Sequence, residues 1–200
     1  MVKPILIIDN SPSNPTQING LLYYLKKITN AKTIIIQGDQ DFSVINRNLY
    51  SFCIVSGGSF FYDYNLITSQ INFLRNTYLP TLGICFGMQI IVHAFGGTGR
   101  DKKLTLKRYG WQQIKITNKY HHHFLFKDVD SKFFAYESHQ FVTGNFSKQI
   151  SLLASSIDGP EIIKIKYKNI FGVQFHPELS NKSIDKNATL ILENFIEKFK

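Results

Sequence analysis

Short apolar runs alternate with stretches of helical spacing over the first hundred residues, and this alternation limits the chain to few folds. Each run has the length and continuity of a strand, and the four runs lie at residues 4–9, 33–37, 52–55 and 81–84. We expect the first and third of them to be buried strands of a parallel sheet. Helical spacing occupies 14–25, which Asn14 and Pro15 are suited to start, and 66–74. The alternation predicts an α/β fold: an open, mostly parallel central sheet with helices on both faces and the run 4–9 as its central first strand. Ligands of such sheets bind beyond the carboxyl ends of the strands.

Beyond residue 96 the pattern changes. We expect Gly96-Gly97-Thr98-Gly99 to end a helix and form a turn. The strand-like segments that follow are shorter and predict a smaller antiparallel sheet portion in the C-terminal half; they lie at 111–117, 133–136, 150–154, 162–167 and 170–175. Helical spacing returns at 187–199. No linker or repeat divides the chain, so residues 1–200 are expected to form a single domain.

Composition excludes several classes of protein. Two cysteines cannot form a disulfide framework and no apolar stretch is long enough to span a membrane, so we expect a cytoplasmic protein with no membrane partner. The 23 basic side chains exceed the 14 acidic ones, for a formal charge of +9. They are scattered and accompany no recognition motif, which predicts a solvated basic surface, or one that docks an acidic partner, and no nucleic acid.

A cysteine flanked by glycines follows the fourth apolar run. The stretch 83–89, GICFGMQ, places Cys85 between the expected strand and a helical pattern. A sharp strand-to-helix turn exposes the sulfur, and the helix dipole favours its thiolate, which is the nucleophilic form. The backbone N–H of Phe86 would then face a substrate carbonyl. A buried structural cysteine is the alternative, and it is how we interpret Cys53, which lies inside an apolar run.

A second motif, QFHPE at 174–178, supplies partners for this cysteine. His176 and Glu178 are two residues apart in a segment expected to be extended, where side chains at that spacing share a face. The imidazole can take the Cys85 proton and return it to a leaving amine, while the carboxylate fixes the tautomer. The two motifs together predict a cysteine hydrolase.

GICFGMQ together with GVQFHPE resembles the class I, or triad, glutamine amidotransferases. The resemblance implies that Cys85 attacks the side-chain amide of glutamine, with His176 and Glu178 completing the triad. It places the oxyanion hole at the backbone N–H groups of Gly58 and Phe86. It also implies glutamine-binding roles for Gly57 and Gln89 and, largely through the backbone, for Ser138, His139 and Gln140. Ser138 and His139 are equally compatible with a surface loop.

Cofactors are expected elsewhere. Ser56-Gly57-Gly58-Ser59 is similar to the start of a pyrophosphate-binding loop, but it continues with aromatic residues, and no phosphate-binding motif appears at a strand end. The run His121-His122-His123 lacks accompanying ligands at metal-binding spacing, so no metal is expected. We therefore expect no cofactor in this chain, with ATP and Mg²⁺ bound only by a separate synthetase subunit.

The ammonia acceptor depends on weaker signals. Lys107-Arg108-Tyr109-Gly110 and Ser138-His139 resemble segments of free-standing glutaminase subunits of archaeal-type GMP synthetases, which implies an ATP-pyrophosphatase partner that converts XMP to GMP. Ile8-Asp9-Asn10 instead favours a synthase of the anthranilate or aminodeoxychorismate type, or one with another acceptor. A γ-glutamyl hydrolase and a non-catalytic binding module are further alternatives.

Overall fold

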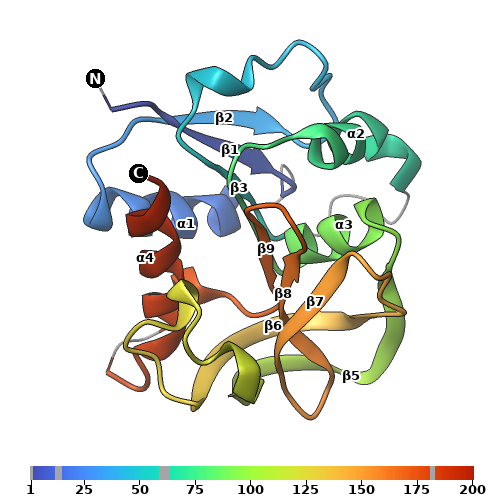
Figure 1. The fold of residues 1–200 in the computed structure, drawn as a ribbon, viewed down its shortest axis with the longest axis vertical. Coiled ribbons are helices and arrows are strands. Elements are labelled where there is room, and N and C mark those ends of the chain that lie inside the picture. The colour runs from blue at the N-terminus through green and yellow to red at the C-terminus, as the bar shows by residue number, and fades with distance from the viewer. Residues whose placement is uncertain (1, 12–14, 59–63, 181–182) are drawn as a thin grey trace.

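The computed structural model describes residues 2–11, 15–58, 64–180 and 183–200. Within them, one mixed sheet of nine strands forms the centre of the molecule (Figure 1). From edge to edge its strands are β2 (Thr33–Gln37), β1 (Ile5–Asp9), β3 (Cys53–Val55), β4 (Thr81–Ile84), β9 (Ile170–Val173), β8 (Pro160–Ile165), β7 (Ile150–Ser155), β5 (Thr98–Ile116) and β6 (Lys132–Gly144).

The first five strands in this order are parallel and the remaining pairs are antiparallel. The predicted combination of a parallel sheet with a smaller antiparallel portion is therefore confirmed. Every residue of β1 is buried, because helices cover both faces. β1 lies inside the sheet but second from its edge, not at its centre, because β9 and the antiparallel strands extend the sheet on the other side of β4.

Two pairs of helices cover the two faces of the sheet, and a hydrophobic core lies under each pair. The side chains of β1 alternate between these two cores. Ile5 and Ile7 point into one core, beneath α1 (Pro15–Ile28) and α4 (Asn187–Phe199). Leu6 and Ile8 point into the opposite core, beneath α2 (Thr68–Asn76) and α3 (Phe86–Ala94). Figure 1 shows the two pairs on opposite sides of the sheet. Burial of each such aliphatic side chain stabilises the fold by about 1.5–3 kcal/mol. Helix α1 begins at Pro15 as predicted, whereas its proposed Asn14 cap lies outside the described residues.

The strand β5 differs most from the prediction. Gly96 has φ 80° and ends α3, as expected, but the predicted turn at 98–99 is wrong because β5 begins at Thr98 and runs for 19 residues. Its first half pairs with β6 from Thr98 opposite Gly144 onward, through two register shifts. This half is polar and largely exposed, so it lacks the apolar run that marks a buried strand. β6 likewise has 13 residues and extends well beyond the predicted 133–136.

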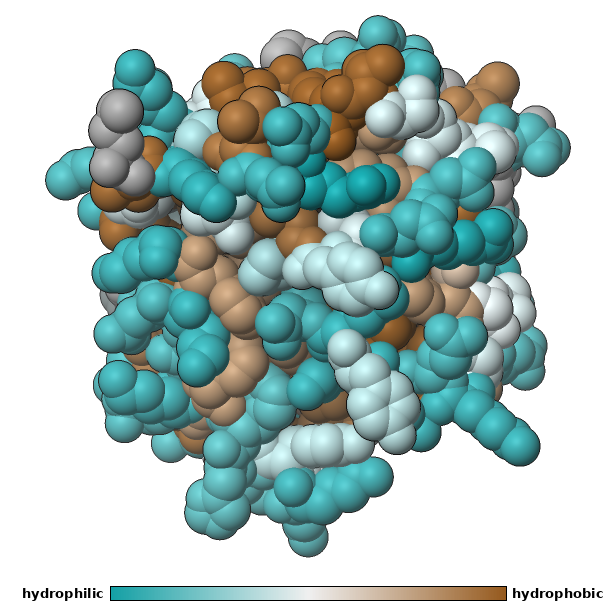
Figure 2. Space-filling view, turned by 45° about the horizontal axis from the view of Figure 1, so that its top comes forward, coloured by the Kyte–Doolittle hydropathy of each residue, from teal (hydrophilic) through white to brown (hydrophobic). Residues whose placement is uncertain are grey.

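Hydrophobic side chains gather on one face of the molecule, at the top of the view in Figure 2. Large exposed hydrophobic residues on and after the edge strand β2 include Ile34, Ile35, Val44 and Leu49. None of the helices in the described ranges has the length and apolar character needed to cross a membrane.

Candidate active site

Cys85 occupies a strained turn between β4 and α3. Its φ of 51° and ψ of −106° are unusual for a residue with a side chain, and such strain costs on the order of 1–3 kcal/mol. The flanking glycines make the turn possible. A Cβ on Gly83 would lie 2.6 Å from the backbone of Gly87, and one on Gly87 would lie 2.2 Å from the carbonyl oxygen of Val55. The close approach of β3, β4 and α3 therefore requires glycine at both positions, and it fixes Cys85 at the start of the helix.

The sulfur of Cys85 lies in a nearly closed environment, since the residue is only 6% exposed. The side-chain amide of Gln174 donates to Sγ across 3.7 Å, and the carbonyl oxygen of Ser138 lies 4.0 Å from Sγ. The positive end of the α3 dipole and the amide donor both favour negative charge on sulfur. The amide of Gln174 and the N-terminus of α3 thus converge on the sulfur.

His176 and Glu178 form a buried pair beside this cysteine. The ring Nδ1 of His176 lies 2.8 Å from Oε1 of Glu178, with side chains 2% and 6% exposed. The backbone N–H of His176 donates to the carbonyl of Tyr136 on β6 at 2.8 Å. The predicted extended segment is wrong at this point: β9 ends at Val173, and Pro177–Leu179 form a turn of 3₁₀ helix, closed by the Leu179 N–H on the His176 carbonyl. Proline at the first position favours this turn, which still brings the carboxylate to the imidazole.

The position of Gly57 brings His176 and Cys85 together. A Cβ on Gly57 would lie 3.0 Å from Cε1 of His176 and 3.5 Å from Cβ of Cys85, so the glycine leaves room for the two side chains to face each other. Burial lowers the pKa of His176, but the charges of Glu178 and Cys85 outweigh it and raise that pKa well above its usual range. Nε2 of the ring is buried and has no hydrogen-bond partner among the described residues, which leaves it free to exchange a proton with the sulfur.

The residues predicted to form the oxyanion hole come from two segments, the start of α3 and the loop after β3. Phe86 is the first residue of α3, directly after Cys85. Gly58 packs against the end of β1 so closely that a Cβ would lie 2.0 Å from the carbonyl oxygen of Asn10. The N–H of Asn10 also donates to the hydroxyl of Ser56, which holds the loop after β3 in place. The role of the two N–H groups at Gly58 and Phe86 stays a prediction.

The predicted glutamine-binding residues 138–140 belong to β6, so the loop alternative is wrong. The Ser138 carbonyl oxygen lies 4.0 Å from Sγ of Cys85, and its role in glutamine binding stays a prediction. His139 is 4% exposed, and its ring is turned into the interior, where Nε2 lies 2.7 Å from Oε2 of Glu137. Gln140 is half-buried. Because side chains alternate along a strand, Ser138 and Gln140 share one face and His139 takes the other.

Gln89 lies behind the cysteine and is bonded to protein groups. Its amide nitrogen donates to the carbonyl of Phe141 at 3.3 Å and to Oε1 of Gln174 at 3.4 Å, while its oxygen accepts from Nε of Arg100 at 3.2 Å. Sequence reasoning missed Gln174 and Arg100. Gln174 stands inside the QFHPE motif and could have been found there, whereas Arg100 follows the predicted turn and lies in the part of β5 that was not predicted as a strand.

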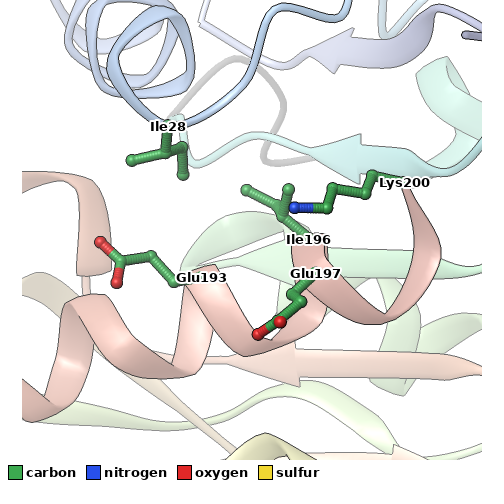
Figure 3. A pocket seen from close by; sticks show the side chains of 5 residues that line it. All are labelled: Ile28, Glu193, Ile196, Glu197 and Lys200. Carbon is green, nitrogen blue, oxygen red and sulfur yellow. The ribbon is translucent and has the colours of Figure 1, made fainter.

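The hollow drawn in Figure 3 is separate from this centre. It lies between the end of α1 and α4, and its walls are Ile28, Glu193, Ile196, Glu197 and Lys200. None of these residues belongs to the triad.

In the histidine run 121–123, Nδ1 of His123 accepts a hydrogen bond from the N–H of Leu125 at 3.3 Å. Burial, followed by the charge of Lys164, lowers the pKa of this imidazole to about 4.

Comparisons of sequence and of structure both find known proteins that are similar to this chain. The sequence model of the family described as glutamine amidotransferase class-I matches residues 6–198. A glutamine-hydrolysing GMP synthase subunit from Methanococcus vannielii is 39% identical over 143 residues, which are 71% of this chain and 70% of that protein. The Methanococcus aeolicus protein of the same name is 34% identical over 194 residues, 96% and 95% of the two chains. A solved structure from Thermoplasma acidophilum, provisionally assigned as a GMP synthase subunit, superposes with a TM-score of 0.82 at 23% identity and covers 98% of this chain and 94% of that one.

Proposed function

The chain belongs to the class I glutamine amidotransferases, and on that premise we propose that it hydrolyses L-glutamine to glutamate and ammonia at Cys85. The observation that carries the proposal is the pairing of a strained, helix-capping cysteine with the buried His176–Glu178 pair. We propose further that the ammonia passes to a separate ATP-pyrophosphatase subunit, which uses it to convert XMP to GMP.

The reaction proceeds in two steps. In the first step, Sγ of Cys85 forms a bond to the side-chain carbonyl carbon of glutamine, the C–N bond breaks, and ammonia leaves with a proton from Nε2 of His176. In the second step, water gives a proton to His176 and attacks the γ-glutamyl thioester, which releases glutamate and the cysteine. Glu178 stays on Nδ1 throughout and stabilises the imidazolium. Backbone N–H groups at Gly58 and Phe86 would hold the oxyanion of each tetrahedral intermediate.

The identity of the acceptor rests on the relatives named as glutamine-hydrolysing GMP synthase subunits. The chain has the nucleophile for ammonia release, and its own residues account for that half of the reaction without a cofactor. ATP and Mg²⁺ belong to the partner, which activates XMP. A class I enzyme that serves another synthase has the same triad and is the alternative to be tested.

Glutamine-dependent GMP formation by the two subunits tests the proposal. The purified chain is combined with the synthetase subunit, XMP, ATP and Mg²⁺, with either glutamine or an ammonium salt as the nitrogen source. We expect both sources to give GMP with the unaltered chain, and only ammonium to give GMP with Cys85→Ser. GMP from glutamine with Cys85→Ser would refute the nucleophile. Covalent labelling of Cys85 by a glutamine-like electrophile without any glutamine-dependent GMP would favour another acceptor.

A further inference from the structure

Three ionisable side chains lie completely inside the protein next to the active site, and the mechanism above does not use them. Glu137 and His139 come from β6 and Glu161 from β8, and they are 0%, 4% and 1% exposed. One atom of each lies within 4.8 Å of the others. Burial of charged groups costs several kcal/mol each unless they are paired, so these residues need an arrangement that satisfies them.

Hydrogen bonds define most of that arrangement. Nδ1 of His139 lies 3.0 Å from the carbonyl oxygen of Phe141, and since a carbonyl only accepts, Nδ1 carries a hydrogen. The other ring nitrogen lies 2.7 Å from Oε2 of Glu137, a contact that needs a hydrogen of its own because two lone pairs would repel there. Oε1 of Glu161 accepts from the hydroxyl of Ser156 at 2.7 Å. The remaining carboxyl oxygens, Oε1 of Glu137 and Oε2 of Glu161, are buried and receive no donor within the described ranges.

The carboxyl groups of Glu137 and Glu161 are close enough for a side-chain hydrogen bond between them. A single proton in that bond satisfies both remaining oxygens, because a protonated carboxyl donates and its ionised neighbour accepts. The environment of Glu161 also favours a carboxyl group that keeps its proton. Burial first, and then the negative charges of Glu137 and Asp158, raise the pKa of Glu161 well above its usual range. Arg108 from β5 is the cation that faces the group, and its guanidinium is already bound to Asp158 at 2.5 and 2.7 Å.

We propose that Glu137 and Glu161 share one proton and, together with His139, act as positioning residues that fix β6 against the glutamine site. The inference rests on the proposed glutaminase function. The Phe141 carbonyl that accepts from His139 also accepts from Gln89, which is bonded to Gln174 and through it to the sulfur. Between Glu137 and His139 stands Ser138, whose carbonyl lies 4.0 Å from Sγ of Cys85. Loss of the shared proton would place two repelling carboxylates under this strand and move both carbonyls.

The short contact between the imidazole and Glu137 favours a proton over a metal ion. Two ligands of a tetrahedral zinc site are each about 2.0–2.2 Å from the metal and therefore about 3.3 Å apart, whereas His139 and Glu137 are separated by 2.7 Å. This separation is that of a direct hydrogen bond.

Carbon-13 NMR of the full chain labelled at glutamate carboxyls detects the shared proton without any catalytic assay. We expect one glutamate carboxyl signal at its protonated position at neutral pH, lost in Glu161→Gln and retained in the control Glu197→Gln at the exposed end of α4. Full ionisation of every glutamate at neutral pH would overturn the proposal. So would a stoichiometric metal found by elemental analysis of the purified chain and absent from Glu161→Gln.

Labelling of Cys85 by a glutamine-like electrophile, in the presence of the synthetase subunit, tests the positioning role. The amide of Glu161→Gln can replace the protonated carboxyl, so we expect unchanged electrophile affinity at neutral pH. The unaltered chain should lose affinity at alkaline pH, where the shared proton leaves, and Glu161→Gln should not. Glu137→Met removes both oxygens and should weaken affinity about tenfold, with the maximal labelling rate altered less than twofold.

Identical alkaline profiles for the unaltered chain and Glu161→Gln would overturn the positioning role. Thermal unfolding identifies a Glu137→Met chain that fails to fold, and in that case the Glu161→Gln profile and the NMR signal decide the matter. These readouts do not depend on the ammonia acceptor. If the proposed ammonia acceptor is incorrect, the NMR and labelling results stay as expected. If Cys85 is labelled in no variant, the glutaminase function itself is contradicted.

Discussion

The side-chain amide of Gln174 bridges Gln89 and the sulfur of Cys85: its nitrogen donates to Sγ at 3.7 Å and its oxygen accepts from Gln89 at 3.4 Å. A donor aimed at the nucleophile stabilises the thiolate and orients it. The bridge gives the first residue of QFHPE a part in the chemistry alongside the histidine and glutamate that follow it.

Gln174→Leu keeps the shape of this side chain and removes the donor. A hydrogen bond to a charged group contributes about 1.5 kcal/mol or more, so we expect Cys85 labelling to slow by about tenfold. Gln113→Leu, at an exposed position of β5, is the matched control and should label at the normal rate. Equal rates for both variants would show that the amide does not stabilise the thiolate.

Gly57→Ala should disable the site without unfolding the protein. The added methyl would lie 3.0 Å from Cε1 of His176 and push the imidazole from its position beside the sulfur, which should slow glutamine hydrolysis at least about tenfold. Gly20→Ala is the control, because its methyl would meet only Leu179 at 3.5 Å and helix α1 should gain about 0.5–1 kcal/mol. Thermal unfolding and the synthetase-coupled glutaminase assay measure both effects. Normal activity in Gly57→Ala would contradict the close packing of the triad.

The pKa of His176 should fall when Glu178 is replaced by Gln. In the folded protein that pKa is raised despite burial, with Glu178 and Cys85 as the causes. A raised histidine pKa adds stability that is complete below the unfolded pKa, near 6.5, and is lost as pH rises through the folded value. Nitrogen-15 NMR of the imidazole should show that it loses its proton at a lower pH in Glu178→Gln than in the unaltered chain. The free energy of unfolding of this variant should drop most at acidic pH, where the histidine is charged. An unchanged titration would mean that the carboxylate does not stabilise the imidazolium.

The two cysteines should differ sharply in reactivity. Cys53 is fully buried in β3, and burial raises the pKa of its thiol. Cys85 is 6% exposed and lies at a helix N-terminus beside His176. Alkylation of the native chain followed by peptide mass mapping should modify Cys85 alone, and unfolding in denaturant should make both react. Modification of native Cys53 at a similar rate would contradict the buried core of β3.

The parallel half of the fold could be predicted because its first four strands lie in continuous apolar runs, of which β1, β3 and β4 are fully buried. β1, β2 and β4 each coincide with an apolar run, and their order along the chain with intervening helices leaves few arrangements. The first half of β5 could not be predicted in this way. Lys102, Lys103 and Lys107 are exposed there, and the segment is a strand because β6 pairs with it, a contact with no trace in local composition.

The residues of the active site likewise differ in whether they could be predicted from the sequence. Cys85, His176 and Glu178 stand in motifs whose chemistry can be inferred from residue type and spacing. The His139 side chain points inward because its face of β6 is buried. Which face is buried depends on how β6 pairs with β5, and the start of β5 could not be predicted from the sequence. The 3₁₀ turn at Pro177–Leu179 was hidden for a similar reason, since the spacing of His176 and Glu178 suits an extended segment as well.

β6 is the last strand of the sheet, hydrogen-bonded along its length to β5 alone among the strands of the described residues. It nevertheless holds the backbone of His176 through Tyr136 and places the Ser138 carbonyl beside Cys85. The nucleophile therefore follows a strand of the parallel half of the sheet, whereas the base and the carbonyl beside the sulfur depend on the last antiparallel strand. A displacement of β6 would therefore move the base relative to the sulfur, although both belong to one catalytic centre.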